Sequence, residues 1–154
     1  MIWQEKCRSI IMLCNITEGG KPKCEQYWPL TAESPVSCSL QSHRFPYKDE
    51  DWNEEKYWPD RGVPRTTTLA IFRILRRVNR LTPCVVHCSA GIGRTGTVVG
   101  IDMVYRRLEL ITELREMRHG AVQMDCQYVY MHRILLVVAE NLKVHSILTC
   151  FLRL

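Results

Sequence analysis

The chain lacks any long hydrophobic segment. Its longest uninterrupted apolar run, Ile134 to Ala139, is six residues, whereas a transmembrane helix needs about 20. The N-terminal segment carries Glu5, Lys6 and Arg8 and has no apolar stretch of the kind found in secretory signal peptides. We therefore expect neither a membrane segment nor a signal peptide in this chain.

Metal-binding cysteine motifs are also missing, although the chain has eight cysteines. No CxxC pair occurs, and the close pairs Cys7/Cys14 and Cys84/Cys88 do not have structural zinc spacing. Without a signal peptide, a disulfide framework is the less favoured interpretation. We expect most of these thiols to be small buried apolar residues.

Internal repeats and low-complexity tracts are absent as well. The 154 residues leave room for one domain, and 46% hydrophobic residues with four Trp exclude a disordered chain. The formal net charge of +5 suits an anionic partner but is too small to indicate nucleic-acid binding.

The first half of the chain predicts strands and a loop. Arg8–Asn15 is a short β-branched apolar run, typical of a strand buried on both faces. Gly19-Gly20 with Pro22 predicts a turn, and Cys24–Trp28 a second strand. The polar tract 30–57 has neither helical nor strand periodicity, so we expect a loop there.

The second half alternates helices and one strand. Residues 66–79 predict an amphipathic helix whose arginines form a solvated face. Cys84–His87 predicts a strand, Thr95 to about Leu110 a helix, and a last helix begins near Asp125. This alternation predicts an α/β domain.

The glycine-rich turn between the predicted strand and helix has three possible readings. Gly91 to Gly96 fits G-x-G-x-x-G, but the region about 20 residues on, Glu109 to Arg118, is helical and charged rather than a strand ending in an acidic residue. A phosphate-binding P-loop is excluded because Thr97 occupies the position of its lysine. A nucleotide cradle is therefore disfavoured.

The third reading starts from Cys88 at the end of the strand, facing a helix N-terminus. Backbone N–H groups of the loop can surround one anion, and glycines at 91 and 93 permit the positive φ angles that such a curl needs. The same field favours a thiolate. Arg94 comes round the loop to hold two oxygens of a tetrahedral anion. Together these groups indicate nucleophilic attack on phosphorus.

Three segments carry a family resemblance. His87-Cys88-Ser89-Ala90-Gly91-Ile92-Gly93-Arg94-Thr95-Gly96 resembles the active-site motif of cysteine-dependent protein tyrosine phosphatases. Tyr57 to Pro64, YWPDRGVP, resembles the mobile acid loop of the tyrosine-specific branch, and Gln123 to Tyr128, QMDCQY, its glutamine loop. The N-terminal segment 1–29 is also similar to that family.

The resemblance implies a mechanism without a metal or cofactor. Cys88 attacks the phosphate of phosphotyrosine and forms a phosphocysteine, while Arg94 and the loop N–H groups hold the oxygens. Asp60 protonates the leaving tyrosine oxygen and then acts as base on water. Gln123 positions that water, supported by Gln127. The remaining implied roles are sulfur stabilisation by Thr95, orientation by His87, and substrate binding by Ser89, Ala90, Gly91, Ile92, Gly93, Arg94, Asp60 and Gln123.

The resemblance also bounds the domain. It implies a partial tyrosine-phosphatase fold over residues 1–142, with a central mixed sheet flanked by helices and the active-site loop between a strand and a helix; residues 143–154 form a tail or the end of the last helix. Expected partners are phosphotyrosine-containing proteins, with no nucleic acid and no membrane segment. The expected location is the cytoplasm, or the cytoplasmic portion of a receptor-type chain.

Two alternatives stay open. Tyrosine-specific domains are longer than this chain, so an inactive or phosphotyrosine-binding remnant is one. Dual-specificity phosphatases are naturally about this short, but the acid loop and the glutamine loop disfavour that branch.

Overall fold

The computed structural model describes residues 2–27, 41–44, 58–64, 70–78, 83–106 and 111–142. The strands are β1 Ser9–Met12, β2 Thr17–Glu18, β3 Lys21–Pro22, β4 Gln41–Arg44 and β5 Cys84–His87. The helices are α1 Ala70–Val78, α2 Arg94–Arg106, α3 Ile111–Met117 and α4 Asp125–Leu142. Four strands precede α1, and β5 lies between α1 and α2. The combination of strands and helices confirms the α/β class.

The central sheet has the order β4-β1-β5, and both of its described pairings are parallel. In register, Ser9 of β1 lies opposite Gln41 on one side and Cys84 on the other. The strand predicted over Arg8–Asn15 is present over Ser9–Met12, and all four of its residues are buried, as predicted. Strand β1 lies between β4 and β5. Because β1 and β5 are parallel and in register, the loop after β5 begins beside the end of β1.

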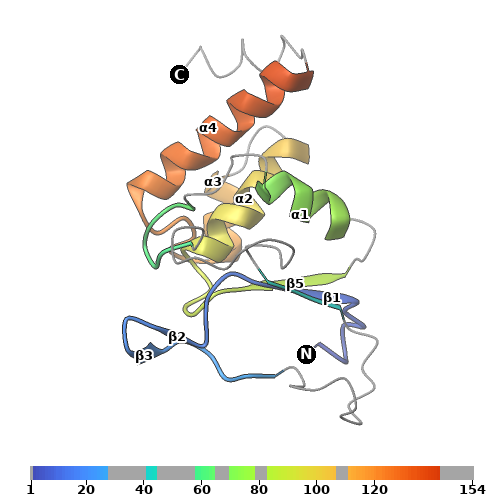
Figure 1. Ribbon diagram of the computed structural model, residues 1–154. Coiled ribbons are helices and arrows are strands. Elements are labelled where there is room, and N and C mark those ends of the chain that lie inside the picture. Colours follow the sequence, from blue (N-terminus) through green and yellow to red (C-terminus); the bar gives the residue numbers. More distant parts are fainter. Residues whose placement is uncertain are drawn as a thin grey trace.

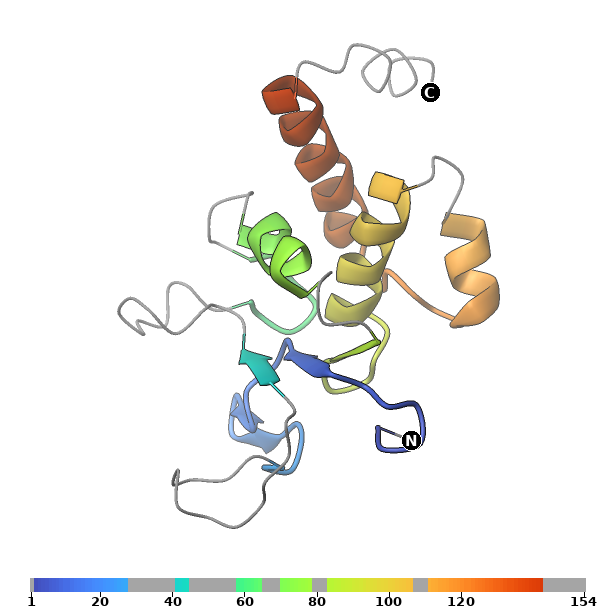
Figure 2. The same cartoon turned by 90° about the vertical axis from the view of Figure 1, so that its right-hand side faces the viewer.

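The helices gather on one side of the sheet (Figures 1 and 2). Helix α2 packs against α4, α3 and β5. The contact buries Ile101 of α2 together with Met131 and Ile134 of α4, each at most 1% exposed. In α1 the predicted stripe is confirmed, since Ile71 and Val78 are buried. Its arginines at 73 and 76 are exposed, as expected for a solvated face.

A two-stranded antiparallel hairpin, β2–β3, projects from the end of β1 (Figure 1). Gly19 and Gly20 form the predicted turn, with φ of 56° and 73°. The prediction of a strand at Cys24–Trp28 is wrong for its described part, because residues 23–27 are outside the ladder. The tight turn places the partner strand directly after it, at Lys21–Pro22, and Pro22 has no N–H with which to extend pairing.

The prediction of an uninterrupted loop over 30–57 is wrong at Gln41–Arg44, which is strand β4. The sequence QSHR has no alternating apolar pattern. This strand forms by pairing with the edge of β1, a contact between residues far apart in the chain, and so local periodicity does not indicate it. The rest of that tract lies outside the described residues.

Helix α2 begins one residue before the prediction, at Arg94, and α4 begins at Asp125 as predicted. The charged segment around 109–118 forms α3, in keeping with its helical character. Over the described parts of the chain, no helix is long and apolar enough to cross a bilayer. The predicted tail, 143–154, lies outside the described residues.

Helix α4 offers a matched test of which face carries the core. Val138 is 7% exposed and Val129 is 64% exposed on the same helix. We expect Val138→Ala to lower the free energy of unfolding by roughly 2 kcal/mol, because it removes two buried carbon groups and leaves a cavity. Val129→Ala should change it by less than about 0.5 kcal/mol. Urea unfolding followed by circular dichroism measures both, and equal effects would contradict this packing.

Candidate active site

The loop after β5 carries Cys88, which is 6% exposed. Gly91 has a φ of 73°, the left-handed conformation predicted for a loop that turns back on itself. Its N–H donates to the Cys88 Sγ at 3.2 Å. A backbone donor aimed at the sulfur stabilises negative charge there, in agreement with a loop whose N–H groups surround an anion.

Gly93 differs from the prediction, because its φ is not in the positive region. A Cβ at this position would lie 3.2 Å from Gln123 Oε1 and 3.2 Å from Gln127 Nε2. Glycine is therefore needed here for close approach of the two glutamine side chains rather than for an unusual backbone angle. Gln123 and Gln127, which were both predicted as site residues, therefore lie against the Cys88 loop at Gly93.

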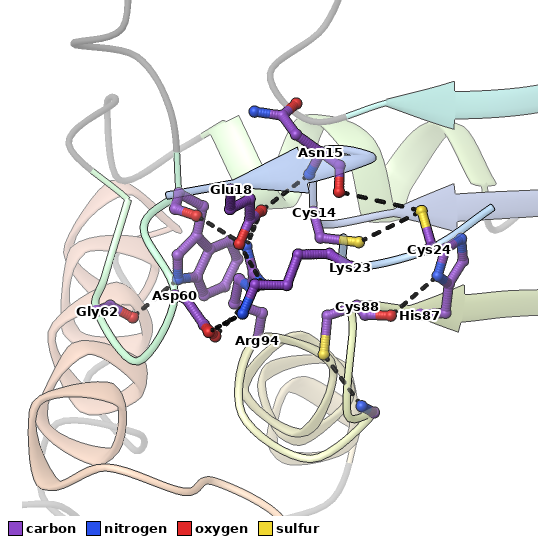
Figure 3. Close-up of polar contacts among 12 residues, drawn as sticks. Cys14, Asn15, Glu18, Lys23, Cys24, Asp60, Gly62, His87, Cys88 and Arg94 are labelled. Atoms are coloured by element: carbon purple, nitrogen blue, oxygen red, sulfur yellow. Dashed lines mark hydrogen bonds and ion pairs between the residues drawn. The ribbon is translucent and has the colours of Figure 1, made fainter. Parts of the chain in front are cut away.

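Arg94 is the first residue of α2 and is 1% exposed. Its Nη1 donates to Glu18 Oε1 at 2.7 Å, and its Nη2 donates to Glu18 Oε2 at 3.0 Å. The fork also reaches the Trp58 carbonyl from Nη1 at 3.1 Å. Figure 3 shows the guanidinium between the hairpin and the acid loop. A bidentate carboxylate thus orients the arginine beside Cys88's loop.

Glu18 and Lys23 are two site residues that the sequence analysis missed. The Glu18 side chain is 7% exposed, and its Oε1 accepts the Asn15 N–H at 2.8 Å. Lys23 donates to Asp60 Oδ2 at 2.7 Å. Both residues belong to the hairpin around the predicted Gly19-Gly20 turn. The Gly19-Gly20 turn could have indicated these residues, because a hairpin brings the charged residues on its two sides close together.

Asp60 is the predicted acid, and its side chain is 45% exposed. The hydrogen bond from Lys23 has the largest effect and lowers the pKa of this carboxyl below its usual value. Burial opposes this shift, and the Arg94 charge, with Nη2 at 3.4 Å from Oδ1, lowers the pKa further. In this arrangement Asp60 is therefore held as a carboxylate.

The acid loop is docked by its tryptophan. Trp58 is 1% exposed, and its Nε1 donates to the Gly62 carbonyl at 2.9 Å. The same carbonyl accepts a hydrogen bond from Gln127 Nε2 at 3.2 Å. Cys126, which the sequence left without a role, is exposed and lies 3.6 Å from the Arg61 carbonyl. Helix α4 thus fixes the loop that presents Asp60.

The glutamine segment is joined to the Cys88 loop through Val122. This β-branched residue has a φ of 59°, an outlier for its type. Its N–H donates to the Ile92 carbonyl at 3.0 Å, and Arg115 donates from Nε to the Ala121 carbonyl at 3.2 Å. Gly96 faces this backbone, and a Cβ there would lie 2.6 Å from Val122 N. Gln123, the next residue, is exposed while Gln127 is buried.

The other predicted residues line the same loop. His87 is hydrogen-bonded through Nδ1 to the Cys88 carbonyl at 3.1 Å and through Nε2 to the Tyr27 hydroxyl at 2.6 Å. The Thr95 hydroxyl is buried and has no hydrogen-bond partner among the described residues. Ser89 and Ala90 are exposed. Arg118, another residue missed from the sequence, donates to the Ala90 carbonyl at 3.1 Å.

The structure therefore brings a thiol, a guanidinium fork and a carboxyl group to one place, on β5–α2, the hairpin and the acid loop. Among the described residues, no group of three or more His, Cys, Asp or Glu side chains is arranged to hold a metal ion. Such a constellation can bind a tetrahedral anion and deliver both a nucleophile and a proton donor to it.

The sequence of the chain is similar to those of known proteins. The family model for protein-tyrosine phosphatase matches residues 1–57 and 52–137. Receptor-type tyrosine-protein phosphatase H of Homo sapiens is 33% identical over 172 residues, which cover 88% of this chain and 15% of that protein. Tyrosine-protein phosphatase non-receptor type 12 of Homo sapiens is 33% identical over 177 residues, covering 92% of this chain and 23% of that protein. The chain thus spans a small part of these relatives.

Solved structures agree on the fold. A structure of PTPN18, described as the basis of its fingerprint on distinct HER2 tyrosine phosphorylation sites, has a TM-score of 0.66 at 22% identity. The matched region covers 86% of this chain and 60% of the PTPN18 chain. PTPN18 in complex with HER2 phosphopeptides has a TM-score of 0.63 at 25% identity, covering 86% of this chain and 63% of that one.

The contact between Gly96 and Val122 gives a prediction for stability. Gly96→Ala should lower the free energy of unfolding by about 1–3 kcal/mol, because the new methyl meets backbone that cannot move aside. Gly100→Ala on the same helix is the matched control. Its methyl meets the Met131 Cε at 2.5 Å, the end of a flexible side chain, so we expect a change below about 1 kcal/mol. Chemical denaturation compares them, and a larger loss for Gly100→Ala would refute this assignment.

Proposed function

Because the chain belongs to the protein-tyrosine phosphatase family, we propose that it hydrolyses phosphotyrosine on proteins through a phosphocysteine intermediate. The observation that carries the proposal is the meeting of three groups at one site. Cys88 lies in a loop with a backbone donor on its sulfur, and the Arg94 fork lies 3.4 Å from the Asp60 carboxylate.

In this proposal the Cys88 sulfur attacks phosphorus, and the bond from phosphorus to the tyrosine oxygen breaks. The Arg94 fork and the loop N–H groups of residues 89–94 hold the three equatorial oxygens as charge develops on them. The structure supports this role of Arg94 because its two nitrogens already hold a planar pair of oxygens on Glu18. The buried Thr95 hydroxyl is available to donate to the sulfur as it leaves.

Asp60 supplies the proton that the leaving oxygen requires, since a phenolate with a conjugate-acid pKa of about 10 leaves poorly near neutral pH. The acid loop must shift Asp60 away from Lys23 for this step. In the second step Asp60 accepts a proton from water, which Gln123 orients. Gln127 supports Gln123 by holding the Gly62 carbonyl and the Met124 N–H. His87 orients the Cys88 backbone through its 3.1 Å contact.

Phosphotyrosine proteins as substrates are supported by relatives named as tyrosine-protein phosphatases, and by PTPN18, whose complex with HER2 phosphopeptides is among the similar structures. A cytoplasmic location, or the cytoplasmic portion of a receptor-type chain, belongs to the same proposal. Relatives of both the receptor and the non-receptor type support it.

The first experiment is turnover of aryl phosphates and a phosphotyrosine peptide by the 154-residue chain. Cys88→Ser should abolish phosphate release while the folded chain still binds the peptide. Asp60→Asn should reduce kcat by roughly 10²–10⁴-fold. That loss should be larger with phenyl phosphate than with p-nitrophenyl phosphate, because the more acidic leaving group needs less help from a proton donor.

Glu140→Gln is the control, since Glu140 is exposed near the far end of α4. A folded chain with no Cys88-dependent turnover would contradict the proposal, and peptide binding without turnover would favour a phosphotyrosine-binding remnant. Equal rates on phosphoserine and phosphotyrosine peptides would favour the dual-specificity branch.

The Lys23–Asp60 contact gives a prediction for pH dependence. Lys23 lowers the pKa of Asp60, so Lys23→Gln should raise that pKa toward its ordinary value. The proton donor is then present up to a higher pH, and the alkaline limb of the kcat/KM profile should move upward. Lys21→Gln on the same hairpin is the control and should leave the limb in place. A downward shift in Lys23→Gln would show that Asp60 is not the titrating acid.

A further inference from the structure

Two thiols face each other at the base of the hairpin. Cys14 follows β1 and is 5% exposed, whereas Cys24 follows β3 and is half-buried. Their Sγ atoms are 4.0 Å apart, although the residues are ten positions apart in the chain. Figure 3 shows both sulfurs pointing toward one another, and the Cys24 sulfur also faces the Asn15 carbonyl. Neither thiol takes part in the proposed hydrolysis.

The backbone holds the two sulfurs together. Leu13 N–H donates to the His87 carbonyl at 2.9 Å, which anchors the end of β1 to β5. Lys23 N–H donates to the Ile16 carbonyl at 2.7 Å, which ties the residue before Cys24 to the residue before β2. The proximity is thus set by backbone hydrogen bonds and not by the side chains alone. A disulfide needs the sulfurs at about 2.05 Å, so side-chain rotation has about 2 Å to close.

We propose that Cys14 and Cys24 form a dithiol modification site, which a hydroperoxide converts into an intramolecular disulfide. The Cys24 sulfur attacks one oxygen of the peroxide, the O–O bond breaks, and Cys24 becomes a sulfenic acid as water or an alcohol leaves. The Cys14 sulfur then attacks the Cys24 sulfur. The S–S bond forms, and the departing hydroxide takes the Cys14 proton as water.

Burial decides the order of the two steps. Burial, together with the neighbouring Cys24, raises the pKa of the Cys14 thiol to about 12, so Cys14 is protonated near neutral pH. Cys24 is more exposed and therefore meets the oxidant first. Cys14 acts afterwards as the resolving thiol, and the second step should accelerate as pH rises because a thiolate is the attacking form.

The bond would enclose the residues that hold the candidate active site. Glu18 lies inside the closed segment, and Lys23 is the residue before Cys24. From this hairpin, Glu18 contacts Arg94 and Lys23 contacts Asp60. A bond between Cys14 and Cys24 would therefore restrain the hairpin without involving the Cys88 sulfur, which distinguishes this site from oxidation of the nucleophile itself.

The test uses the 154-residue chain carrying Cys88→Ser, so that its outcome does not depend on phosphatase activity. The protein is treated with hydrogen peroxide, remaining thiols are alkylated, and the chain is digested with trypsin and chymotrypsin. Cleavage after Lys23 and Tyr27 separates Cys14 from Cys24 and Cys24 from the cysteine at 38. We expect a linked pair of peptides, about two hydrogen masses lighter than their sum, which disappears on reduction with dithiothreitol.

Single variants in the same background assign the roles. Cys7→Ser should retain the linked pair. Cys14→Ser should lose it and accumulate a dimedone-reactive sulfenic acid on Cys24, whereas Cys24→Ser should leave Cys14 alkylatable. Recovery of Cys14 and Cys24 as free thiols after peroxide, or linkage of either to a different cysteine, overturns the proposal. That mapping is made on the chain with both thiols present, so a folding defect in a single variant does not obscure it.

Discussion

The burial of one guanidinium is the constraint on which the rest of the structure depends. Arg94 is 1% exposed, and a buried cation without partners costs several kcal/mol. Its fork is satisfied by the Glu18 carboxylate and the Trp58 carbonyl, which come from two segments distant in sequence. Burial of Arg94 at the first residue of α2 therefore depends on contacts from both the hairpin and the acid loop. Burial of this charge ties the three segments together.

The same arrangement decides the charge of the candidate acid. Asp60 lies between Lys23 and Arg94, and both cations favour its carboxylate form. The hydrogen bond from the Trp58 indole to the Gly62 carbonyl gives the loop that carries this carboxylate a defined position.

A second junction, at Val122, joins the glutamine segment to the Cys88 loop. Its positive φ is sustained by a hydrogen bond to the Ile92 carbonyl and by the missing side chain of Gly96. Strain of this kind persists only where the surroundings over-determine the backbone. Here it places Gln123 beside Gly93, so the position of a glutamine on one segment is set by glycines on another.

Sequence reasoning located the helices α1, α2 and α4, the strands β1 and β5, and the loop of Cys88. These features depend on neighbouring residues: apolar spacing of 3.6 for the helices, a β-branched run for β1, and contiguous N–H groups with Gly91 for the loop. Strand β4 and the absence of a strand at 24–27 were not foreseen. Both follow from pairing partners and turn register, which local composition does not encode.

The sequence by itself predicted that a cysteine, an arginine and a glycine-rich turn form one anion-binding unit, because they are contiguous in a loop that precedes a helix. Only the tertiary structure decided that Glu18 orients Arg94, that Lys23 holds Asp60, and that Cys14 faces Cys24. These contacts join segments tens of residues apart or across a turn. Their distances depend on sheet order and hairpin register, which are set by the packing of the described chain.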